Sequence, residues 1–334
     1  MKFDKLFITG GAGYVGSSIV PDLLNNGYKV TVYDTLYFGS EFLPKNKNLK
    51  IIKGDIRDID KLKQSCNDHQ VFINLACISN DSSFELDESL STQINFDAFE
   101  PMVLAAKKNG IKRFINASTS SVYGVSDKKD VKEDHPLVPL TLYNKFKALT
   151  EPLLFKHVDE NFEGVIFRPA TVCGYAPRQR LDLSVNILTN FAVNKSMIKV
   201  FGGDQLRPNL HIKDYGEIVD ILIKAEKDKI QNQIFNVGYQ NLSINEIAKL
   251  VKKVVEKEFP NKKEIKIIKS KSDDNRSYHI NSDKVKEILG FHPKRSIEVA
   301  IKDLCDAFKN NLIPNSFEDE NYYNIKKMKL LNIK

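Results

Sequence analysis

Short apolar runs alternate along the first half of the chain with longer segments in which apolar residues recur at helical spacing. The run at residues 71–75 is almost wholly apolar, which is typical of a parallel strand buried on both faces. This alternation predicts an α/β fold built on a doubly wound parallel sheet. The expected strands cover residues 5–8, 28–33, 49–53, 71–75, 113–117 and 165–168. The expected helices cover residues 14–24, 88–108 (broken only at Pro101), 142–161, 243–259, 297–310, and a helix opened by 177–183 that runs to about 193.

A glycine-rich turn joins the first expected strand to the first expected helix, with glycines at positions 10, 11, 13 and 16. In such a turn one glycine lets the chain reverse, one lets a pyrophosphate approach the backbone, and one lets the helix pack on its strand. The helix N-terminus then directs free N–H groups and a positive dipole end at the phosphates. A glycine-rich loop that binds nothing is the alternative, because a glycine motif alone is weak evidence.

Residues at the ends of the next expected strands favour dinucleotide binding at this turn. Asp34 ends the second expected strand, 18 residues after Gly16, where a carboxylate can accept hydrogen bonds from the adenosine ribose. The same carboxylate would repel a 2′-phosphate, so the pattern predicts NAD rather than NADP. Asp55 and Ile56 could flank the adenine, although a helix cap explains Asp55 equally well. Asn95 is a polar residue that could reach the cofactor ribose.

Composition narrows the function classes. The chain has 334 residues, a net charge of +7 and four cysteines without paired or metal-ligand spacing. These features predict a cytoplasmic protein without a catalytic metal. No apolar run is long enough to span a membrane or to form a signal peptide. The lysine clusters are expected to be solvated faces rather than nucleic-acid or membrane contacts, although they would favour an anionic small substrate.

A Tyr-x-x-x-Lys spacing, which places both side chains on one helix face, occurs at Tyr143/Lys147, Tyr322/Lys326 and Tyr323/Lys327. Only the first pair follows a strand end rich in hydroxyls, 24 residues after Thr119. A tyrosine acts as a base near neutrality only if its pKa falls by roughly 3 units, which is about 4 kcal/mol. A desolvated lysine beside a positively charged nicotinamide could supply that stabilisation.

Three motifs carry a family resemblance: Thr-Gly-Gly-Ala-Gly-Tyr-Val-Gly from Thr9, Ala-Ser-Thr-Ser-Ser-Val-Tyr-Gly from Ala117, and Tyr-Asn-Lys-Phe-Lys from Tyr143. To about residue 310 the chain resembles the extended short-chain dehydrogenase/reductases, and within them the NAD-dependent nucleotide-sugar epimerase/dehydratase family. The resemblance implies a Rossmann sheet with a smaller α/β substrate-binding domain. It also implies that Thr119 holds the sugar hydroxyl, Tyr143 moves its proton, and Lys147 binds the nicotinamide ribose and tunes Tyr143.

The expected site has two groups of residues besides Thr119. The cofactor group comprises Gly10, Gly13, Tyr14, Val15, Gly16, Asp34, Asp55, Ile56, Leu75, Ala76, Asn95, Tyr143, Lys147 and Pro169. The substrate group comprises Ser79, Ser120, Thr171, Arg178, Arg180, Asn186, Arg207 and Arg276. Arginines suit the anionic diphosphate of a nucleotide sugar, because the guanidinium fork matches phosphate oxygens. The resemblance nominates Arg207 most directly and Arg276 less directly.

The residues after Thr119 bear on the reaction. By the resemblance, dehydratases carry Asp-Glu there, decarboxylating members carry Glu at the second position, and 3,5-epimerases carry Cys. This chain has Ser120 and Ser121, which lack useful acidity or basicity near neutrality. A nucleotide-sugar 4-epimerase is therefore expected. A net 4-dehydrogenase of the GDP-heptose type, acting in capsule or lipopolysaccharide biosynthesis, and a non-catalytic NAD(H)-binding protein stay open.

The expected organisation divides the chain into three parts. Residues 1–172, with return segments near 213–239, form the dinucleotide-binding domain, and residues 173–212 and 240–312 form the substrate-binding domain. Residues 313–334 form a basic, aromatic tail outside the resemblance, with no role assigned beyond packing on the body or on a partner. The two long helices are expected to pair in a homodimer through a four-helix bundle.

Overall fold

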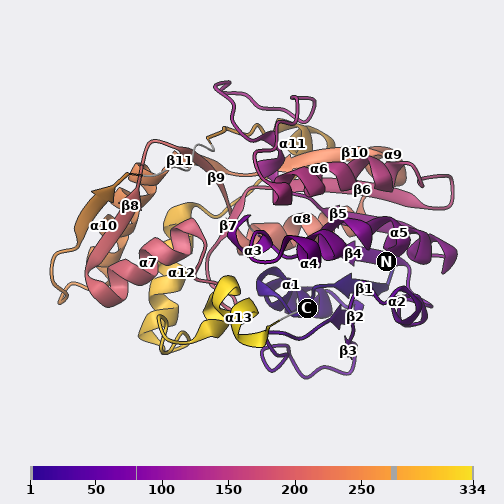
Figure 1. Cartoon of the computed structure of the whole chain (residues 1–334), viewed down its shortest axis with the longest axis horizontal. Coiled ribbons are helices and arrows are strands. Elements are labelled where there is room, and N and C mark those ends of the chain that lie inside the picture. Colours follow the sequence, from indigo (N-terminus) through magenta and orange to yellow (C-terminus); the bar gives the residue numbers. More distant parts are fainter. Residues whose placement is uncertain (1–2, 80, 272–276, 333–334) are drawn as a thin grey trace.

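The computed structural model describes residues 3–79, 81–271 and 277–332, and the chain forms two lobes (Figure 1). In the larger lobe the described residues form a seven-stranded parallel sheet in the order β10-β6-β5-β4-β1-β2-β3. Its strands are β1 (Lys5–Thr9), β2 (Lys29–Asp34), β3 (Leu49–Lys53), β4 (Val71–Asn74), β5 (Arg113–Ala117), β6 (Glu163–Pro169) and β10 (Gln233–Val237). The doubly wound parallel sheet expected from the sequence is confirmed.

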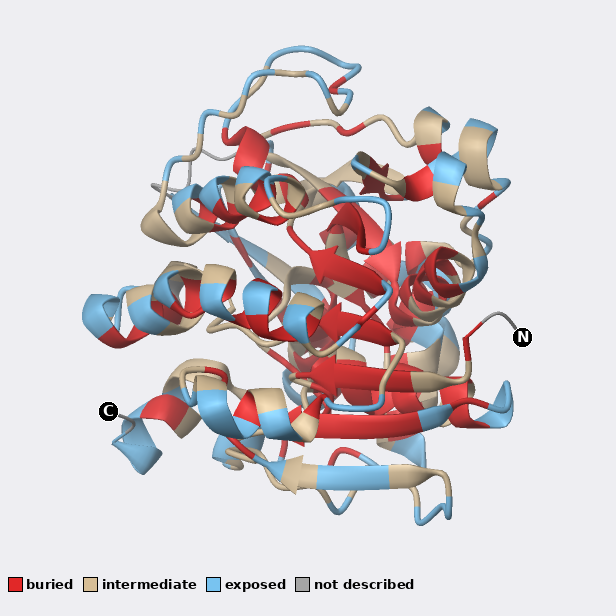
Figure 2. Ribbon diagram, turned by 90° about the vertical axis from the view of Figure 1, so that its right-hand side faces the viewer, coloured by how far each residue is buried: buried red, intermediate tan, exposed pale blue. Residues whose placement is uncertain are grey.

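Helices cover both faces of this sheet, and Figure 2 shows its buried strands stacked between them, with edge strand β3 largely exposed. One face carries α1 (Tyr14–Asn25), α8 (Ile212–Lys224) and α11 (Asp283–Leu289). The other face carries α2 (Ile59–Ser65), α5 (Phe99–Lys108) and α6 (Leu142–Phe155). Short helices α3 (Asp81–Phe84), α4 (Glu88–Thr92) and α9 (Lys227–Ile230) complete the lobe.

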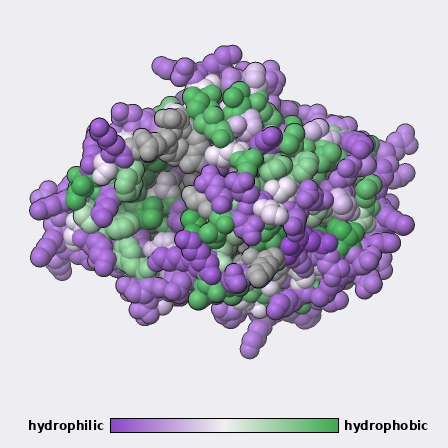
Figure 3. Space-filling view, viewed as in Figure 1, coloured by the Kyte–Doolittle hydropathy of each residue, from purple (hydrophilic) through white to green (hydrophobic). Residues whose placement is uncertain are grey.

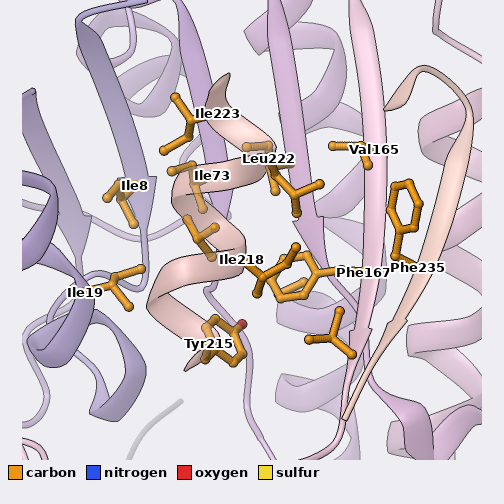
Figure 4. Close-up of a cluster of buried hydrophobic side chains, with 14 of the residues drawn as sticks. Ile8, Ile19, Ile73, Val165, Phe167, Tyr215, Ile218, Leu222, Ile223 and Phe235 are labelled. Atoms are coloured by element: carbon orange, nitrogen blue, oxygen red, sulfur yellow. The ribbon is translucent and has the colours of Figure 1, made fainter. Parts of the chain in front are cut away.

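The alternation of side chains along each strand produces two cores. In β4, Ile73 faces the α1–α8 core while the preceding Phe72 faces the α5 core. Figure 4 shows Ile218 and Leu222 of α8 packed over the strands in the first core. Because both faces are buried, the central strands read as continuous apolar runs, which is why they were recognisable in the sequence.

The smaller lobe packs beside the carboxyl ends of these strands. It contains β7 (Thr171–Cys173), β9 (Leu206–His211) and β11 (Gln240–Ser243) in one sheet, and β8 (Met197–Phe201) paired with β12 (Lys266–Ser270). Helices α7 (Ser184–Lys195), α10 (Ile244–Glu258) and α12 (Ile297–Lys309) share a third apolar core. Ser243 and Glu246 form a reciprocal capping box at the start of α10. The chain ends with α13 (Asn324–Leu331), which returns to the larger lobe (Figure 1).

Three helix boundaries differ from the sequence prediction. The expected break at Pro101 is wrong, because Pro101 lies in the first turn of α5, where its missing N–H interrupts no helical bond. The irregularity comes earlier, at a π-helical turn, Gln93–Asp97. Helix α6 ends at Phe155 rather than at 161. Residues 177–183 form an irregular loop with bends and α7 begins only at Ser184, because the backbone N–H of Arg178 bonds to Ser17 and that of Leu181 bonds to Tyr322.

The surface is mostly hydrophilic on the face shown in Figure 3, with apolar side chains gathered in separate patches. Among the described residues no helix has both the length and the apolar character needed to cross a membrane.

Candidate active site

A cavity of about 900 Å³ lies where the carboxyl ends of β1, β2, β4 and β5 face the smaller lobe. This is the edge of an open α/β sheet at which ligands bind. Eighteen residues expected from the sequence line it: Gly10, Gly13, Tyr14, Val15, Asp34, Asp55, Ile56, Leu75, Ala76, Ser79, Thr119, Tyr143, Lys147, Pro169, Thr171, Arg178, Arg180 and Arg207.

The glycine turn at one end of the cavity has the shape that a phosphate cradle requires. Gly10 adopts φ +72°, and a Cβ there would lie 2.6 Å from the backbone nitrogen of Ala76. A Cβ at Gly16 would strike the backbone of Gly11, so helix α1 packs this closely only because the position is glycine. Beside Gly13 the nearest atom to a Cβ would be the Gly10 oxygen at 3.3 Å, which leaves the backbone approachable from the cavity.

Asp34 lies at the end of β2, next to this turn. Its carboxylate accepts hydrogen bonds from the backbone N–H groups of Ala12 (3.0 Å) and Leu36 (2.8 Å). Burial nevertheless raises the pKa of Asp34 above its usual value. The carboxylate is therefore fixed in position and lines the cavity, as a ribose-binding residue must.

Thr119, Tyr143 and Lys147 converge from two elements. Thr119 follows β5 and caps the 3₁₀ turn Ser120–Tyr123. Tyr143 and Lys147 lie one turn apart at the start of α6, which Thr141 caps. Lys147 is 7% exposed, and its Nζ donates to the carbonyl oxygen of Ala117 at 2.9 Å. This bond ties α6 to the end of β5, so the strand that carries Thr119 also orients Lys147.

Burial raises the pKa of Tyr143 well above its usual value of 10, and the neighbouring Cys77 adds to this shift. A phenol of this kind keeps its proton at neutral pH, so it is not available as a proton acceptor. Tyr143 therefore needs a nearby positive charge before it can act as a base, and Lys147 shares its helix face.

A buried polar network supports the base of this site. Glu151, on α6 one turn after Lys147, accepts hydrogen bonds from Ser118 (2.6 Å) and from Arg168 Nε (2.9 Å) and Nη2 (2.6 Å). Arg168 also donates to the hydroxyl of Tyr123 at 2.7 Å. Because Ser118 precedes Thr119, this network fixes the strand end against α6.

Two buried arginines border the cavity opposite the first turn of α1. Arg178 is 5% exposed and Arg180 is 7% exposed. Arg178 stacks on the ring of Phe38 at 3.5 Å, while Arg180 donates to Asp182 at 2.5 Å and to Ser79 at 2.7 Å. Arg178 Nε and Arg180 Nη2 have no hydrogen-bond partner among the described residues. Burial and the adjacent Arg180 lower the pKa of Arg178 to about 9.

These orphaned guanidinium nitrogens and the open backbone at Gly13 fit the pyrophosphate of a dinucleotide. Guanidinium nitrogens that are buried without a hydrogen-bond partner are costly unless an anion binds them. The helix N-terminus on the other side of the cavity also favours negative charge. Gly10, Gly13 and Arg178 would hold the phosphates, and Asp34 would hold the adenosine ribose.

The structure places four expected residues behind the cavity wall rather than on its surface. Gly16 packs α1 on the turn. Asn95 forms two hydrogen bonds with the backbone of Ile78, at 2.8 and 2.9 Å. Asn186 donates to Tyr14 and to the backbone of Arg180, so it supports two lining residues. Ser120 lies 3.4 Å from the hydroxyl of Tyr278. Arg276 lies outside the described residues.

The cavity also has lining residues that the sequence did not indicate. Phe38 and Tyr278 belong to loops, and the hydroxyl of Tyr278 lies 3.1 Å from Ser121 Oγ. Asn324 and Met328 come from the C-terminal tail. No motif marks these positions, and only the folded chain brings the tail to the cavity.

Arg207, which the sequence did indicate, lies on β9 and lines the smaller-lobe side of the cavity. Its Nη1 donates to the carbonyl oxygen of Leu206 at 2.9 Å.

Comparisons with known proteins agree with this geometry. The family described as "NAD dependent epimerase/dehydratase family" matches residues 6–238. A UDP-N-acetyl-alpha-D-glucosaminuronate decarboxylase of Bacillus cytotoxicus is 29% identical, with 91% of this chain and 98% of that protein covered. A UDP-glucose 4-epimerase of Bacillus subtilis is 26% identical, with coverage of 89% and 95%. The crystal structure of a UDP-glucose 4-epimerase of Thermotoga maritima with UDP-glucose superposes with a TM-score of 0.82 at 26% identity, covering 92% and 99%.

Proposed function

Since the chain belongs to the NAD-dependent epimerase/dehydratase family, we propose that it is a nucleotide-sugar 4-epimerase. It would interconvert two nucleotide-diphosphate sugars that differ in configuration at carbon 4, without net consumption of NAD. The observation that carries this proposal is the pair Ser120–Ser121 directly after Thr119. Ser121 lines the cavity and Ser120 lies behind it, and both side chains lie within 3.4 Å of the Tyr278 hydroxyl, so this part of the site offers hydroxyl groups rather than an acid and a base.

The carboxylates of the cavity support the same choice. The described residues that line it include Asp34, Asp55, Asp81 and Asp182. Each is held by this chain: Asp34 by backbone N–H groups, Asp55 by Arg57, Asp81 by Thr141, and Asp182 by Arg180. Elimination of water and decarboxylation of a neighbouring carbon need an additional acid or base at the sugar. An oxidation and reduction at one carbon need only the Thr119–Tyr143–Lys147 group.

Thr119, Tyr143 and Lys147 have distinct tasks in the proposed mechanism. When bound, NAD would supply the acceptor and then the donor of the hydride at carbon 4, and a positive charge beside Tyr143. Thr119 Oγ1 holds the hydroxyl of carbon 4, and Tyr143 Oη takes its proton and later gives one back. Lys147 binds the nicotinamide ribose and stabilises the phenolate of Tyr143. Arg207 is positioned to meet the diphosphate of the substrate from the smaller lobe.

The test compares two tyrosines with the same sequence spacing. Tyr143→Phe keeps the ring but removes the proton acceptor, so turnover should fall by about 10²–10⁴-fold while NAD still binds. Tyr322→Phe, in the tail, should leave turnover unchanged. A panel of UDP- and GDP-sugars, scored for epimer formation and for NADH absorbance, measures both variants. Near-normal turnover of Tyr143→Phe on the substrate so identified would place the active site elsewhere.

We propose in addition that two copies pair through α5 and α6. Leu104 on α5 is 47% exposed and Leu149 on α6 is 41% exposed, although both helices also contribute buried apolar side chains to the core on their face of the sheet. Two neighbouring helices with exposed leucines suit a four-helix contact. Light scattering at micromolar concentration should give the mass of a dimer, and Leu104→Lys/Leu149→Lys should give a folded monomer. A monomeric wild type would exclude the dimer.

A further inference from the structure

The C-terminal segment 314–331, here called the strap, crosses from the smaller lobe to the larger one. It leaves α12, passes α7 and ends with α13 near α3 (Figure 1). The sequence resemblance does not extend into it. It is nevertheless ordered by specific contacts at both of its ends.

Buried polar contacts fix the first part of the strap to α7. Ser316 is 6% exposed and donates to Asn190 Oδ1 at 2.7 Å. The hydroxyl of Tyr323 donates to the carbonyl oxygen of Ser316 at 2.8 Å, and Asn190 Nδ2 donates to that hydroxyl at 3.3 Å. The ring of Phe317 meets the ring of Phe191 at 5.0 Å. This half of the strap is therefore anchored, so its continuation has a defined position.

The second part of the strap contacts Arg178 at the cavity. Asn324 Oδ1 accepts from Arg178 Nη2 at 2.8 Å, and Asn324 Nδ2 donates to Ser79 Oγ at 3.1 Å. The backbone N–H of Asn324 donates to Asp182 at 3.1 Å. One side chain thus joins the loop after β4 to the loop before α7 across the mouth of the cavity. Four residues later, Met328 lines the cavity and is 9% exposed.

We propose that the strap is the outer wall of the dinucleotide site and that Asn324 and Met328 hold the cofactor in place. Asn324 orients Arg178, whose Nε has no partner among the described residues, toward the turn at Gly13, where the pyrophosphate would bind. The cofactor then lies between the glycine turn and a segment that must part from Ser79 and Arg178 before the cofactor leaves. The strap therefore slows release of NAD and NADH.

Slow release of the cofactor suits the proposed 4-epimerase reaction, and this step of the inference rests on that proposed function. A 4-epimerase reduces the keto sugar with the same NADH that the first half-reaction formed, so it works without exchanging the cofactor. A net dehydrogenase must exchange NADH for NAD in every cycle. A strap fastened by three hydrogen bonds at Asn324 suits the first reaction better than the second.

The test measures cofactor retention rather than activity. Wild-type protein should keep NAD(H) through gel filtration, as measured by acid release and chromatography. Asn324→Ala removes the two side-chain hydrogen bonds, and NADH should then dissociate about fivefold to thirtyfold faster in stopped-flow fluorescence. Asn321→Ala is the matched control, because Asn321 is exposed on the same segment three residues earlier.

A second pair of variants tests the apolar contact. Met328→Ala should also speed NADH release, whereas Leu330→Ala, at a position 63% exposed, should not. Thermal unfolding of each variant without cofactor verifies that it is folded. Unchanged NADH release in both Asn324→Ala and Met328→Ala, or a wild type that loses its cofactor on the column, would overturn the role of the strap. Neither result would affect the Tyr143 test, because epimerase activity can be measured with NAD added.

Discussion

Two pairs of buried arginines in this molecule differ in how their nitrogens are used. Arg113 and Arg168 lie within the sheet, each 2% exposed or less. Arg113 bonds to Glu163 and to the carbonyl oxygens of Leu222, Ile223 and Ala225, and Arg168 bonds to Glu151, Tyr123 and Glu133. Arg178 and Arg180, at the cavity, are almost as buried but each has a nitrogen without a partner among the described residues.

The pKa values of Arg168 and Arg178 differ, although burial also lowers the pKa of Arg113, so the pKa shift alone does not separate the two pairs. The carboxylate of Glu151 raises the pKa of Arg168 even though burial opposes the shift. Arg178 has no such carboxylate bond, and burial together with the charge of Arg180 lowers its pKa to about 9. Burial alone therefore does not distinguish a structural arginine from one that binds a ligand. What distinguishes them is whether the chain itself satisfies the guanidinium.

The largest expected effect is on stability. Arg113→Met removes the partner of the buried Glu163 carboxylate and of three carbonyl oxygens around the end of α8. The free energy of unfolding should fall by about 3–5 kcal/mol, as for other buried ion pairs that lose one partner. Urea unfolding followed by circular dichroism measures this change. A loss below about 1 kcal/mol would show that Arg113 is not the structural residue that its contacts suggest.

Arg178→Met should have the opposite profile to Arg113→Met, with little loss of stability and a clear loss of affinity for NAD. Without cofactor the unfolding free energy should stay within about 1 kcal/mol of wild type, because a desolvated cation beside Arg180 is removed. The affinity for NAD should fall by about tenfold to a hundredfold, through loss of hydrogen bonds to a charged phosphate. Calorimetric titration measures the second effect. If Arg178→Met lost as much stability as Arg113→Met and bound NAD normally, the two pairs would not differ in role.

The smallest expected effect is on the pH dependence and the cofactor preference of NAD binding, both of which depend on Asp34. Its carboxylate must be ionised to accept hydrogen bonds from the ribose, and burial raises its pKa. NAD affinity should therefore decline on acidification at a higher pH than an ordinary aspartate would cause. Asp34→Asn should remove this dependence, and Asp34→Ala should narrow the preference for NAD over NADP by about tenfold. Equal binding of both cofactors by the wild type would contradict this role.

The sequence predicted the parts of the site that depend on local chain geometry. The glycine turn, Asp34 and the Tyr143–Lys147 spacing each belong to one strand end or one helix turn, and all of them line the cavity. The central strands were found because burial on both faces makes them rich in apolar residues. Pro101 misled the helix prediction, since a proline in the first turn of a helix breaks nothing.

The parts that could not be predicted depend on contacts distant in the chain. Asn324 meets Ser79 across 245 residues, and no spacing rule connects a tail asparagine to a strand end. The arginine pair was recognisable as a possible anion site, but its position beside the glycine turn follows from the bond between Arg178 and Ser17. The irregular course of residues 177–183 has the same cause.

The measurement that tests the proposed 4-epimerase most directly is proton NMR of the reaction in D₂O. The purified protein, with NAD below the concentration of substrate, is incubated with each of a panel of UDP- and GDP-sugars. If the protein is a 4-epimerase, one substrate should convert to its 4-epimer. The product should retain the hydrogen on carbon 4 and incorporate no deuterium, and NADH should not accumulate. Release of carbon dioxide, a deuterated deoxy-keto product, or NADH formed in proportion to an oxidised sugar would contradict it.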